Sequence, residues 1–396
     1  MNKPKLLYAS PLWPKKSGIS EYSEILVQSL KDFFNITLLI DNYRISNKSF
    51  EEDFEIVKYE KGDVYKDYDA ILYNIGNSPD YHSYMYDAMR ENPGYIILHD
   101  FVLYFLTTGY YRDKRQSLRK IYEMEGIKGL NIVKDSIKNS PFKDLIRLKD
   151  IADKLPLNKE ILEMAKGIFV HSDYTKKLIQ NTLALTDVYK INFVKMPIKK
   201  SDYSFDFAFK KYGIPKDAFV IGAIGFIAPT KQNELTCKAI KIYNDMHKEK
   251  IYYFMIGDGN CADPYLKQYI IKTGFLENSE YEVAISRCNL VFNLRYPTNG
   301  ETSATLIQCM SVEIPCVVTD IGWFHEVPDD CVGKLPSDIT ASEIANKIAV
   351  FKNTDWTSIR SNAYQYVNQE CNPQNISRVI YQYIIHDFTA DNSSKM

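Results

Sequence analysis

The sequence predicts an α/β fold with two doubly wound parallel sheets that face a common cleft. Short apolar runs alternate with helical stretches up to about residue 171, and the same alternation restarts after residue 200. Glycine-containing loops join strands to helices in both halves. Such alternation is typical of parallel strands covered by helices on both faces. The expected strands are 5–10, 36–40, 69–74, 94–98, 167–171, 219–225, 251–256, 289–294 and 315–319.

A chain of 396 residues is too long for one ordinary core and suits two domains of about 200 residues each. We place the first domain at 1–197 and the second at 198–375, because Pro197 and the charged residues around it interrupt the periodicity over 194–204. The last segment, 376–396, is expected to return to the first domain as a helix with a polar tail.

The composition narrows the class of protein. A hydrophobic content of 45% with 25% charged residues is typical of a globular chain, and a formal net charge of -1 gives no general attraction to nucleic acid. The chain has no basic, apolar leader and no apolar run of bilayer length, so we expect a cytoplasmic protein. The seven cysteines form no close CxxC pair, which favours reduced, buried thiols over a zinc or redox site.

The segment 292–330 places polar residues where a buried strand meets a helix. The pattern predicts a strand ending at Leu294, a tight loop at 297–300 and a helix over 302–312. Unpaired N–H groups and a partial positive charge at a helix start suit an anion such as a diphosphate, and a carboxylate there suits sugar hydroxyls. The residues at this helix start are Glu301, Thr302 and Ser303.

Two further strand–loop–helix units precede this segment. The first has a loop containing Ser17 and Gly18 before an amphipathic helix, and Gly18 lets the backbone approach a ligand. The second has a strand ending at Gly225 and a helix beginning near Lys231. One unit lies in each half of the chain, so we expect both to face the cleft.

Five segments together resemble the family 4 retaining glycosyltransferases (GT4), which have the GT-B fold of two Rossmann-like domains. They are PLWPKKSGISEY, IILHD, FVHSDYTKKLI, GFIAPTKQ and LRYPTNGETSATLIQCMSVEIPCVVTDIGWFHEVPDD. The resemblance spans roughly residues 5–385, and the last segment is the specific one because a lone glycine-rich loop is a weak signal. It implies an N-terminal acceptor-binding domain and a C-terminal domain that binds the nucleotide sugar.

The resemblance implies that Lys231 is the family's phosphate-binding lysine. A flexible ammonium at a helix start neutralises a departing diphosphate without a metal ion, although a solvated surface lysine is the alternative. The family's partner arginine falls at Phe226, which is a departure. Arg295 is expected to supply the missing positive charge, with a structural ion pair as the alternative.

The family carries two glutamates eight positions apart, and this chain departs from that spacing. Alignment on the following helix places Gly300 at the first glutamate and Gln308 at the second, so that Glu301 lies one position late. We expect Glu301 to bind the donor sugar and Gln308 to bind the ribose hydroxyls. The alternative for Glu301 is a helix cap, and Thr302 and Ser303 either bind phosphate or cap the helix.

His99 ends the strand YIILH and matches a histidine that the family places beside the donor sugar. We assign it to positioning the sugar or polarising a hydroxyl, with a buried core histidine as the alternative. Asp100 either contacts the acceptor or caps the next helix. Gly257 follows a strand near the expected base site, although turn geometry alone also explains it. His171 follows another strand, in a context that also indicates a helix cap.

The resemblance implies a retaining hexosyl transfer by front-face attack, in which the departing phosphate oxygen takes the proton of the acceptor. No metal and no cofactor are expected. The donor is a GDP-, UDP- or dTDP-sugar, and the acceptor is a glycan or lipid-linked molecule of surface polysaccharide or glycolipid biosynthesis. Two alternatives remain open, a GT-B nucleotide-sugar epimerase and a non-catalytic nucleotide-sugar-binding subunit.

The segment 112–149 is locally basic, with 11 Lys and Arg against 5 Asp and Glu. Leu118, Ile121 and Leu130 are spaced among these charges on helical sequence. Such a helix favours a peripheral contact with anionic lipid at the inner face of the membrane. A solvated helix face is the alternative.

Overall fold

A computed structural model describes residues 3–141, 144–183, 187–201 and 204–393. The chain divides into two compact units. The first comprises Met1–Val194, Asn299–Thr302 and Asn372–Met396, and the second comprises Lys195–Thr298 and Ser303–Cys371. Residues 202 and 203 of the expected domain junction lie outside the described residues, as do 142 and 143 of the basic segment.

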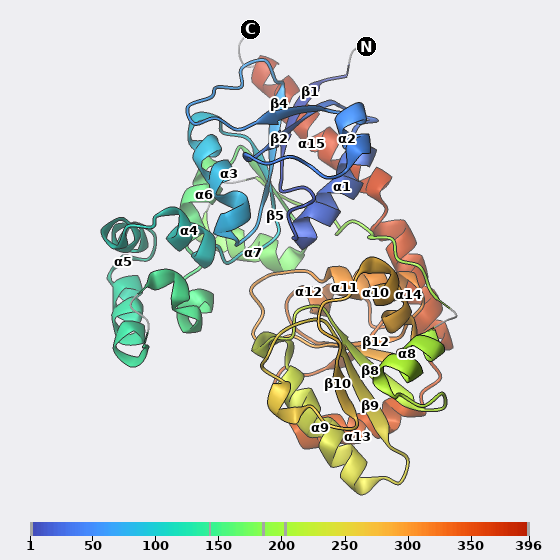
Figure 1. Cartoon of the computed structure of the whole chain (residues 1–396). Helices are drawn as coiled ribbons and strands as arrows, with labels where there is room; N and C mark the ends of the chain where they lie inside the picture. The colour runs from blue at the N-terminus through green and yellow to red at the C-terminus, as the bar shows by residue number, and fades with distance from the viewer. Residues whose placement is uncertain (1–2, 142–143, 184–186, 202–203, 394–396) are drawn as a thin grey trace. The chain divides into compact units, whose positions relative to one another are not determined.

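The first unit contains a seven-stranded parallel sheet in the order β3-β2-β1-β4-β5-β6-β7, shown in Figure 1. The chain therefore starts in the centre of the sheet, winds outward to β3, and returns to the centre at β4. The strands are β1 (Lys5–Ala9), β2 (Asn35–Ile40), β3 (Glu55–Lys58), β4 (Ala70–Ile75), β5 (Tyr95–Leu98), β6 (Gly167–Val170) and β7 (Val188–Lys190).

Helices connect these strands. The α-helices of the first unit are α1 (Gly18–Leu30), α2 (Lys48–Asp53), α3 (Pro79–Glu91), α4 (Tyr104–Tyr110), α5 (Lys114–Asn139), α6 (Lys159–Met164), α7 (Asp173–Thr182) and α15 (Pro373–Ser393). Two short 3-10 helices, η1 (Leu145–Arg147) and η2 (Lys149–Lys154), lie between α5 and α6. The last helix, α15, packs against α1.

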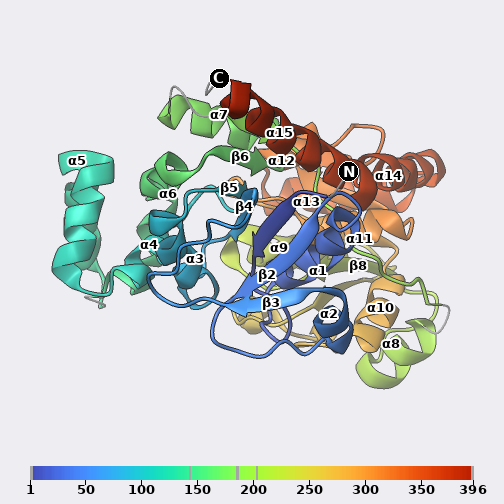
Figure 2. The same ribbon diagram turned by 90° about the horizontal axis from the view of Figure 1, so that it is seen from above.

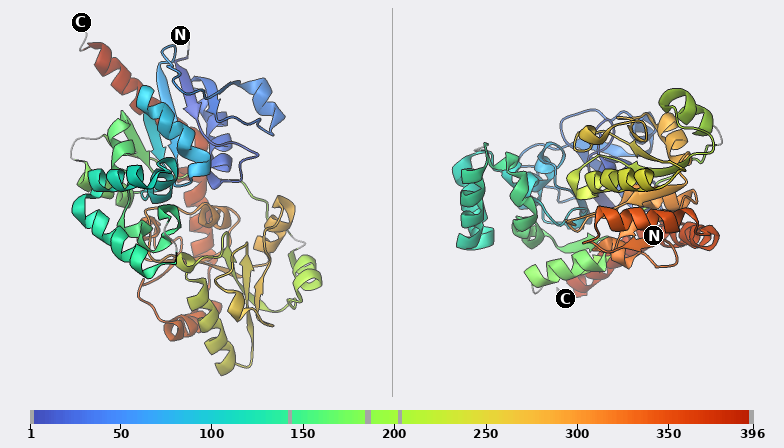
Figure 3. Two further views of the ribbon diagram at one scale, coloured as in Figure 1. Left: turned by 60° about the vertical axis from the view of Figure 1, so that its left-hand side comes forward. Right: turned by 90° about the horizontal axis from the view of Figure 1, so that it is seen from below.

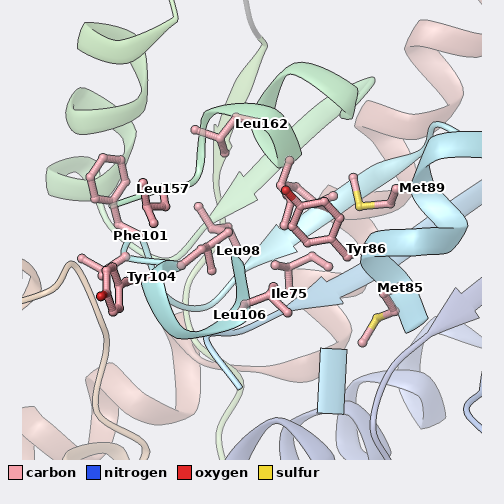
Figure 4. Packing of buried hydrophobic residues seen from close by; sticks show 14 of the residues in the cluster. Ile75, Met85, Tyr86, Met89, Leu98, Phe101, Tyr104, Leu106, Leu157 and Leu162 are labelled. Atoms are coloured by element: carbon pink, nitrogen blue, oxygen red, sulfur yellow. The ribbon is translucent and has the colours of Figure 1, made fainter. Parts of the chain in front are cut away.

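Alternate strand residues pack on opposite faces of this sheet. Leu7 and Ala9 of β1 belong to a core that also contains Met85 and Met89 of α3, part of which Figure 4 shows. Tyr8, between them, is also fully buried. Burial on both faces is the condition under which a parallel sheet reads as a continuous apolar run, which is why the sequence pattern revealed these strands.

The second unit repeats the arrangement with six parallel strands in the order β10-β9-β8-β11-β12-β13. Its strands are β8 (Phe219–Ile224), β9 (Ile251–Ile256), β10 (Ile270–Lys272), β11 (Leu290–Asn293), β12 (Cys316–Thr319) and β13 (Gly333–Leu335). Its helices are α8 (Ser204–Tyr212), α9 (Asn233–Met246), α10 (Asn278–Ser286), α11 (Ala304–Ser311), α12 (Trp323–Glu326), α13 (Ala341–Lys352) and α14 (Thr357–Glu370), with the 3-10 turns η3 (Pro229–Lys231) and η4 (Asp263–Tyr265).

Helices α9 and α13 lie side by side, and their apolar residues join those of the strands in one core. Helices α11 and α14 also pack together. Buried residues on α11, including Leu306, Ile307 and Met310, hold this helix in the unit. The start of α11 is therefore fixed relative to the strands on either side of it in sequence.

The predicted fold class is confirmed, and the structure adds four strands that the sequence analysis missed. These are β3, β7, β10 and β13, which form the outer edges of the two sheets. They have only three or four residues, several of them partly exposed, so they give no continuous apolar run. The expected helix over 302–312 begins later, at Ala304.

Helix α5 projects from the first unit beyond α4 and α6, as Figures 2 and 3 show. It is interrupted at Gly126, where φ is 64° and ψ is -158°. Ile121 is fully buried, and Leu118 and Leu130 pack partly buried against the core. The apolar residues that the sequence analysis assigned to a membrane-facing stripe thus face inward. No helix within the described ranges combines the length and the apolarity needed to cross a bilayer.

Candidate functional site

The strand order of the second unit reverses between β8 and β11, which are neighbours in the sheet. Connections leave such a point in opposite directions, and ligands of open α/β sheets bind outside the carboxyl ends of the strands there. The loop after β8 carries Lys231, and the loop after β11 carries Arg295. Both positively charged candidates of this unit therefore lie at the switch point of its sheet.

Lys231 ends the 3-10 turn η3, close to the helix start that the sequence predicted near this residue. Gln232 adopts a left-handed conformation with φ of 53°, and α9 starts only at Asn233. The turn directs the Lys231 side chain back over the sheet, because its Nζ donates a hydrogen bond of 2.9 Å to the carbonyl of Ile224, the last residue of β8. A Cβ atom added to Gly225 would lie 2.7 Å from this Nζ.

The loop after β8 is joined to the loop after β9 by backbone hydrogen bonds. Gly225 N donates to Ile256 O at 2.9 Å, and Ile227 N donates to Asp258 O at 2.7 Å. Gly257 permits this close approach, because a Cβ atom there would lie 2.1 Å from the carbonyl oxygen of Gly225. The structure therefore supplies a packing reason for Gly257, which the sequence analysis placed near the base site.

Hydrogen bonds also hold the loop after β11, joining it to the loop after β8 and to β12. Tyr296 N donates to Thr230 O at 2.8 Å, and Arg295 N donates to the Thr319 hydroxyl at 2.9 Å. The guanidinium of Arg295 reaches within 3.5 Å of the Thr230 hydroxyl, which is one residue from Lys231. Phe226 is 67% exposed on the loop after β8. Two loops thus carry positive charge, while the aromatic ring of Phe226 occupies the position at which the sequence resemblance implied an arginine.

Helix α11 begins with a side-chain cap. The Ser303 hydroxyl accepts a hydrogen bond from Leu306 N at 3.2 Å and donates to Asn293 Oδ1 at 3.1 Å. Asn293 also donates to the Thr305 hydroxyl at 2.9 Å. Ser303 is therefore the helix cap, one of its two predicted roles. Thr305 lies beside Gly225, since its Cγ2 would be 3.7 Å from a Cβ atom there.

The capping role of Ser303 bears on the helix-cap alternative for Glu301. Glu301 lies before the cap, and its carboxylate accepts a hydrogen bond of 2.6 Å from Asn299 N. It closes a turn and does not cap α11. Glu301, Gly300 and Thr302 group with the first unit, where the carbonyl of Gly300 accepts a 2.8 Å hydrogen bond from the Thr175 hydroxyl of α7. Thr302 is partly exposed.

Gln308 is directed into the second unit. It is 5% exposed, and its amide oxygen accepts a hydrogen bond of 2.8 Å from the Tyr281 hydroxyl of α10. A neutral amide can hold a tyrosine in this way without the charge that a buried glutamate would bring, which gives Gln308 a structural role in this conformation.

In the first unit, Gly18 is the first residue of α1, and Ser17 caps the helix by accepting from Ile19 N at 3.2 Å. A Cβ atom on Gly18 would meet no heavy atom within 4 Å. The packing of the described residues therefore does not require glycine at this position. The open space beside the Gly18 backbone is what a ligand would need in order to approach it.

His99 follows β5 at the carboxyl edge of the first sheet and is 9% exposed. Its Nε2 lies 3.3 Å from Asn74 Oδ1, and its Nδ1 lies 3.4 Å from Nε2 of His171. The Tyr22 ring packs edge-on against His99, with ring centroids 4.7 Å apart. Both ring nitrogens thus have protein partners, so His99 reaches a ligand through a nitrogen only if one of these contacts opens.

Asp100 accepts a hydrogen bond from Asn77 N at 3.0 Å. The side-chain oxygen of Asn77 in turn accepts hydrogen bonds from the first turn of α4, from Phe105 N at 2.9 Å and from Leu106 N at 3.2 Å. Asp100 therefore holds Asn77, which satisfies first-turn N–H groups of the next helix, while the N-cap position of that helix is Leu103.

Sequence reasoning missed the polar residues that end buried strands. Asn293 ends β11, Thr319 ends β12 and Asn74 lies near the end of β4, and each organises a neighbouring loop or side chain. The sequence pattern that could have identified these residues is a single polar residue at the end of an apolar run. Among the described residues, no group of three or more His, Cys, Asp or Glu side chains is arranged to hold a metal ion.

Gly257→Ala and Gly18→Ala form a matched pair for stability. Gly257→Ala should lower the free energy of unfolding by more than about 1 kcal/mol, because its Cβ atom would clash with the Gly225 carbonyl. Gly18→Ala should change it by less than about 0.5 kcal/mol, because the site is open. Urea denaturation measures both, and equal effects would contradict the loop packing described here.

Burial lowers the pKa of His171 to about 4 and that of His82 to about 3, and it lowers the pKa of His99 well below its usual range. The folded protein therefore binds fewer protons than the unfolded chain below the ordinary pKa of about 6.5. Stability should be complete above that pH and fall as the pH decreases toward 4, by up to about 1.4 kcal/mol per pH unit for each histidine. Denaturation at several pH values tests this, with His82→Gln expected to reduce the slope by about one proton. An unchanged slope would show that His82 does not contribute.

No protein-family model matches the chain, and no curated protein matches it in sequence. Solved structures do resemble it. Sucrose-phosphate synthase from Thermosynechococcus elongatus has a TM-score of 0.65 at 12% identity, covering 98% of this chain and 100% of that chain. HepE from Anabaena, in complex with UDP-glucose, has 0.62 at 14%, covering 98% and 100%. WaaG, a glycosyltransferase involved in lipopolysaccharide biosynthesis, has 0.58 at 10%, covering 95% and 99%. The chain therefore has two Rossmann-like domains in the GT-B fold of these enzymes.

Proposed function

We propose that the protein is a retaining GT4-type glycosyltransferase that moves a hexosyl group from a nucleotide-diphosphate sugar to a glycan or lipid-linked acceptor. The observation that carries this proposal is the position of Lys231, whose ammonium is held at the carboxyl end of β8 by the Ile224 carbonyl. This is the switch point of the second sheet, where an anionic ligand of such a fold binds. The fold shared with glycosyltransferases supports the same reaction class.

In the proposed reaction, the bond between the anomeric carbon and the diphosphate breaks, and negative charge grows on the departing oxygen. Lys231 and Arg295 stabilise that charge, together with the start of α11 near Thr302 and Ser303. Fixed cations and helix-terminal amides stabilise it efficiently, because they need no reorganisation during the reaction. The acceptor attacks from the same face, and the departing oxygen takes its proton. The proposed reaction uses no metal ion.

Glu301 is the proposed partner of the donor sugar hydroxyls, on a turn closed by its contact with Asn299 and beside Gly300. Gly257 and Gln308 border the proposed nucleoside site, where Gln308 acts by holding Tyr281. In the first unit, Gly18 lets the α1 start approach the donor. His99 is proposed to position the sugar, and Asp100 to contact the acceptor.

A non-catalytic nucleotide-sugar-binding subunit is the second candidate. Two observations favour it, the exposed Phe226 at the family's arginine position and the commitment of Gln308 to Tyr281. A subunit of this kind would bind the nucleotide without turnover. The two candidates therefore differ in whether sugar is released from the donor.

Binding and turnover test the proposal separately. A thermal-shift panel of GDP, UDP and dTDP with their sugars should give stabilisation by one nucleotide class, since a ligand that binds only the folded state stabilises it. Incubation with the matching nucleotide sugar should release free nucleoside diphosphate. Stabilisation without release would favour the binding subunit, a changed sugar on an intact diphosphate would indicate an epimerase, and no stabilisation by any nucleotide would contradict all three.

Lys231→Ala should lower the turnover number by about 100-fold or more, because removing one charge-stabilising donor typically costs that much. The matched control is Lys238→Ala, which removes an exposed lysine of the adjacent helix α9 and should leave the rate unchanged. Steady-state kinetics measure both, with circular dichroism to verify folding. A folded Lys231→Ala variant with the wild-type rate would remove the leaving-group assignment.

We further propose that the protein works in the cytoplasm at the inner face of the membrane, through the described part of 112–149. Tyr122 and Ile127 are 53% and 67% exposed on α5 at either side of Gly126. The charged residues near them in sequence are Arg119, Lys120 and Lys128 together with Glu123 and Glu125. Apolar side chains inserted among cations suit an anionic lipid surface.

Wild-type protein should co-sediment with phosphatidylglycerol vesicles at low salt and dissociate at high salt, because the attraction is screened. A Tyr122→Ser, Ile127→Ser double variant should bind several-fold less. Val64→Ser, which changes a residue 54% exposed outside α5, is the control. Equal binding to phosphatidylcholine vesicles, or no loss in the double variant, would contradict the contact.

A further inference from the structure

A chain of hydrogen-bonding groups crosses four adjacent strands at the carboxyl edge of the first sheet. It runs from Asn74 on β4 to His99 after β5, then to His171 after β6, and ends at the carbonyl of Ile191 after β7. The three links measure 3.3 Å from Asn74 Oδ1 to His99 Nε2, 3.4 Å from His99 Nδ1 to His171 Nε2, and 3.4 Å from His171 Nδ1 to Ile191 O.

Both ends of the chain are hydrogen-bond acceptors. The Asn74 amide nitrogen donates to Ala9 O at 3.3 Å, so the amide oxygen is the atom directed at His99. A flipped amide would place two oxygens against each other and is disfavoured. The other end is a backbone carbonyl, which only accepts. Each terminal link therefore needs a proton on a histidine nitrogen.

Counting protons shows what the pair requires. Three links need three protons, and two neutral imidazoles carry two. A neutral pair leaves one link without a proton, whereas one added proton completes all three. A second added proton would place N–H against N–H at the central link, so the chain accommodates one and excludes a second.

We propose that His171 is a positioning residue that fixes His99 in the tautomer with its proton on Nε2, and that the single proton completing the chain resides on His171. With His99 donating to Asn74, its Nδ1 is left to accept from His171 Nε2. The added proton then occupies His171 Nδ1, facing the Ile191 carbonyl.

The side chains around the two histidines favour protonation of His171 before His99. His99 is packed by the Tyr22 ring and faces two other imidazoles, those of His171 and His82, whose charges oppose a proton on it. His171 contacts Tyr22 and Phe193, with ring centroids 5.4 Å and 5.0 Å away, and has the Ile191 carbonyl as a partner for its charge. The Tyr22 phenol packs against both histidines, and the Tyr8 phenol interacts with Tyr22; burial keeps both neutral by raising their pKa values.

The role of His99 toward a ligand rests on the proposed function. The tautomer of His99 is proposed independently of that function. A histidine locked in this way offers a ligand the edge of a neutral, oriented ring and not a mobile acid or base. His171 would thus act on a donor sugar through His99, by holding that ring in place.

Nitrogen-15 NMR of histidine-labelled full-length protein tests the proposal, because the six histidines give a simple spectrum and ring-nitrogen shifts report the tautomer. At pH 7.5 both His99 and His171 should carry their proton on Nε2. On acidification His171 should become doubly protonated before His99. A proton on Nδ1 of His99 at pH 7.5, or protonation of His99 first, would overturn the proposal in the wild-type protein alone.

Two variants separate positioning from packing. His171→Gln retains an N–H donor toward His99 and should keep the His99 tautomer while losing the titration. His171→Leu removes the donor and should give His99 a mixture of tautomers. A pure Nε2 tautomer in a folded His171→Leu variant would show that Asn74 alone fixes the ring. If donor turnover exists, His171→Leu should raise KM for the donor several-fold and His171→Gln should restore it; absence of turnover would affect only the proposed function.

Discussion

The contact between the Lys231 ammonium and the Ile224 carbonyl is the interaction on which the account of the second unit depends. It is possible because backbone hydrogen bonds tie the loops after β9 and β11 to the loop after β8, leaving Lys231 a fixed surface to fold against. A lysine side chain is otherwise flexible and loses much conformational freedom when it is ordered. The hydrogen-bonded loops offset part of that cost before any ligand arrives. A preorganised cation at a switch point is the arrangement that charge stabilisation requires.

The first unit has a different arrangement at the carboxyl edge of its sheet. Polar residues at this edge pair with one another, from Asn74 through His99 to His171. Burying these two imidazoles costs stability in acid, and such a cost is commonly tolerated where a ring must be held in one orientation. In our proposal, the loops of the second sheet stabilise a diphosphate with positive charge, and the first sheet presents an oriented neutral ring to a sugar or its acceptor.

The sequence predicted the fold class and the central strands because residues buried on both faces of a parallel sheet give continuous apolar runs. It did not predict β3, β7, β10 and β13, whose edge positions expose part of each short strand. At the candidate site, a motif indicated Lys231, but the 3-10 turn that holds it was not predicted, because the left-handed Gln232 has no distinctive sequence signal. Gln308 was expected at a ribose. The hydrogen bond that occupies its amide oxygen comes from Tyr281 of α10, 27 residues away in sequence, and local sequence patterns do not reveal such a contact. The contact between His99 and His171 likewise depends on the order of the strands in the sheet, which the spacing of apolar residues along the chain does not predict.

The most direct measurement is a crystal structure of the protein with the nucleoside diphosphate that gives the largest thermal shift. The account predicts that the diphosphate lies at the carboxyl end of β8, within hydrogen-bond distance of Lys231 Nζ and near the first turn of α11. A diphosphate bound elsewhere, with Lys231 still directed at Ile224 and no anion beside it, would contradict the central claim.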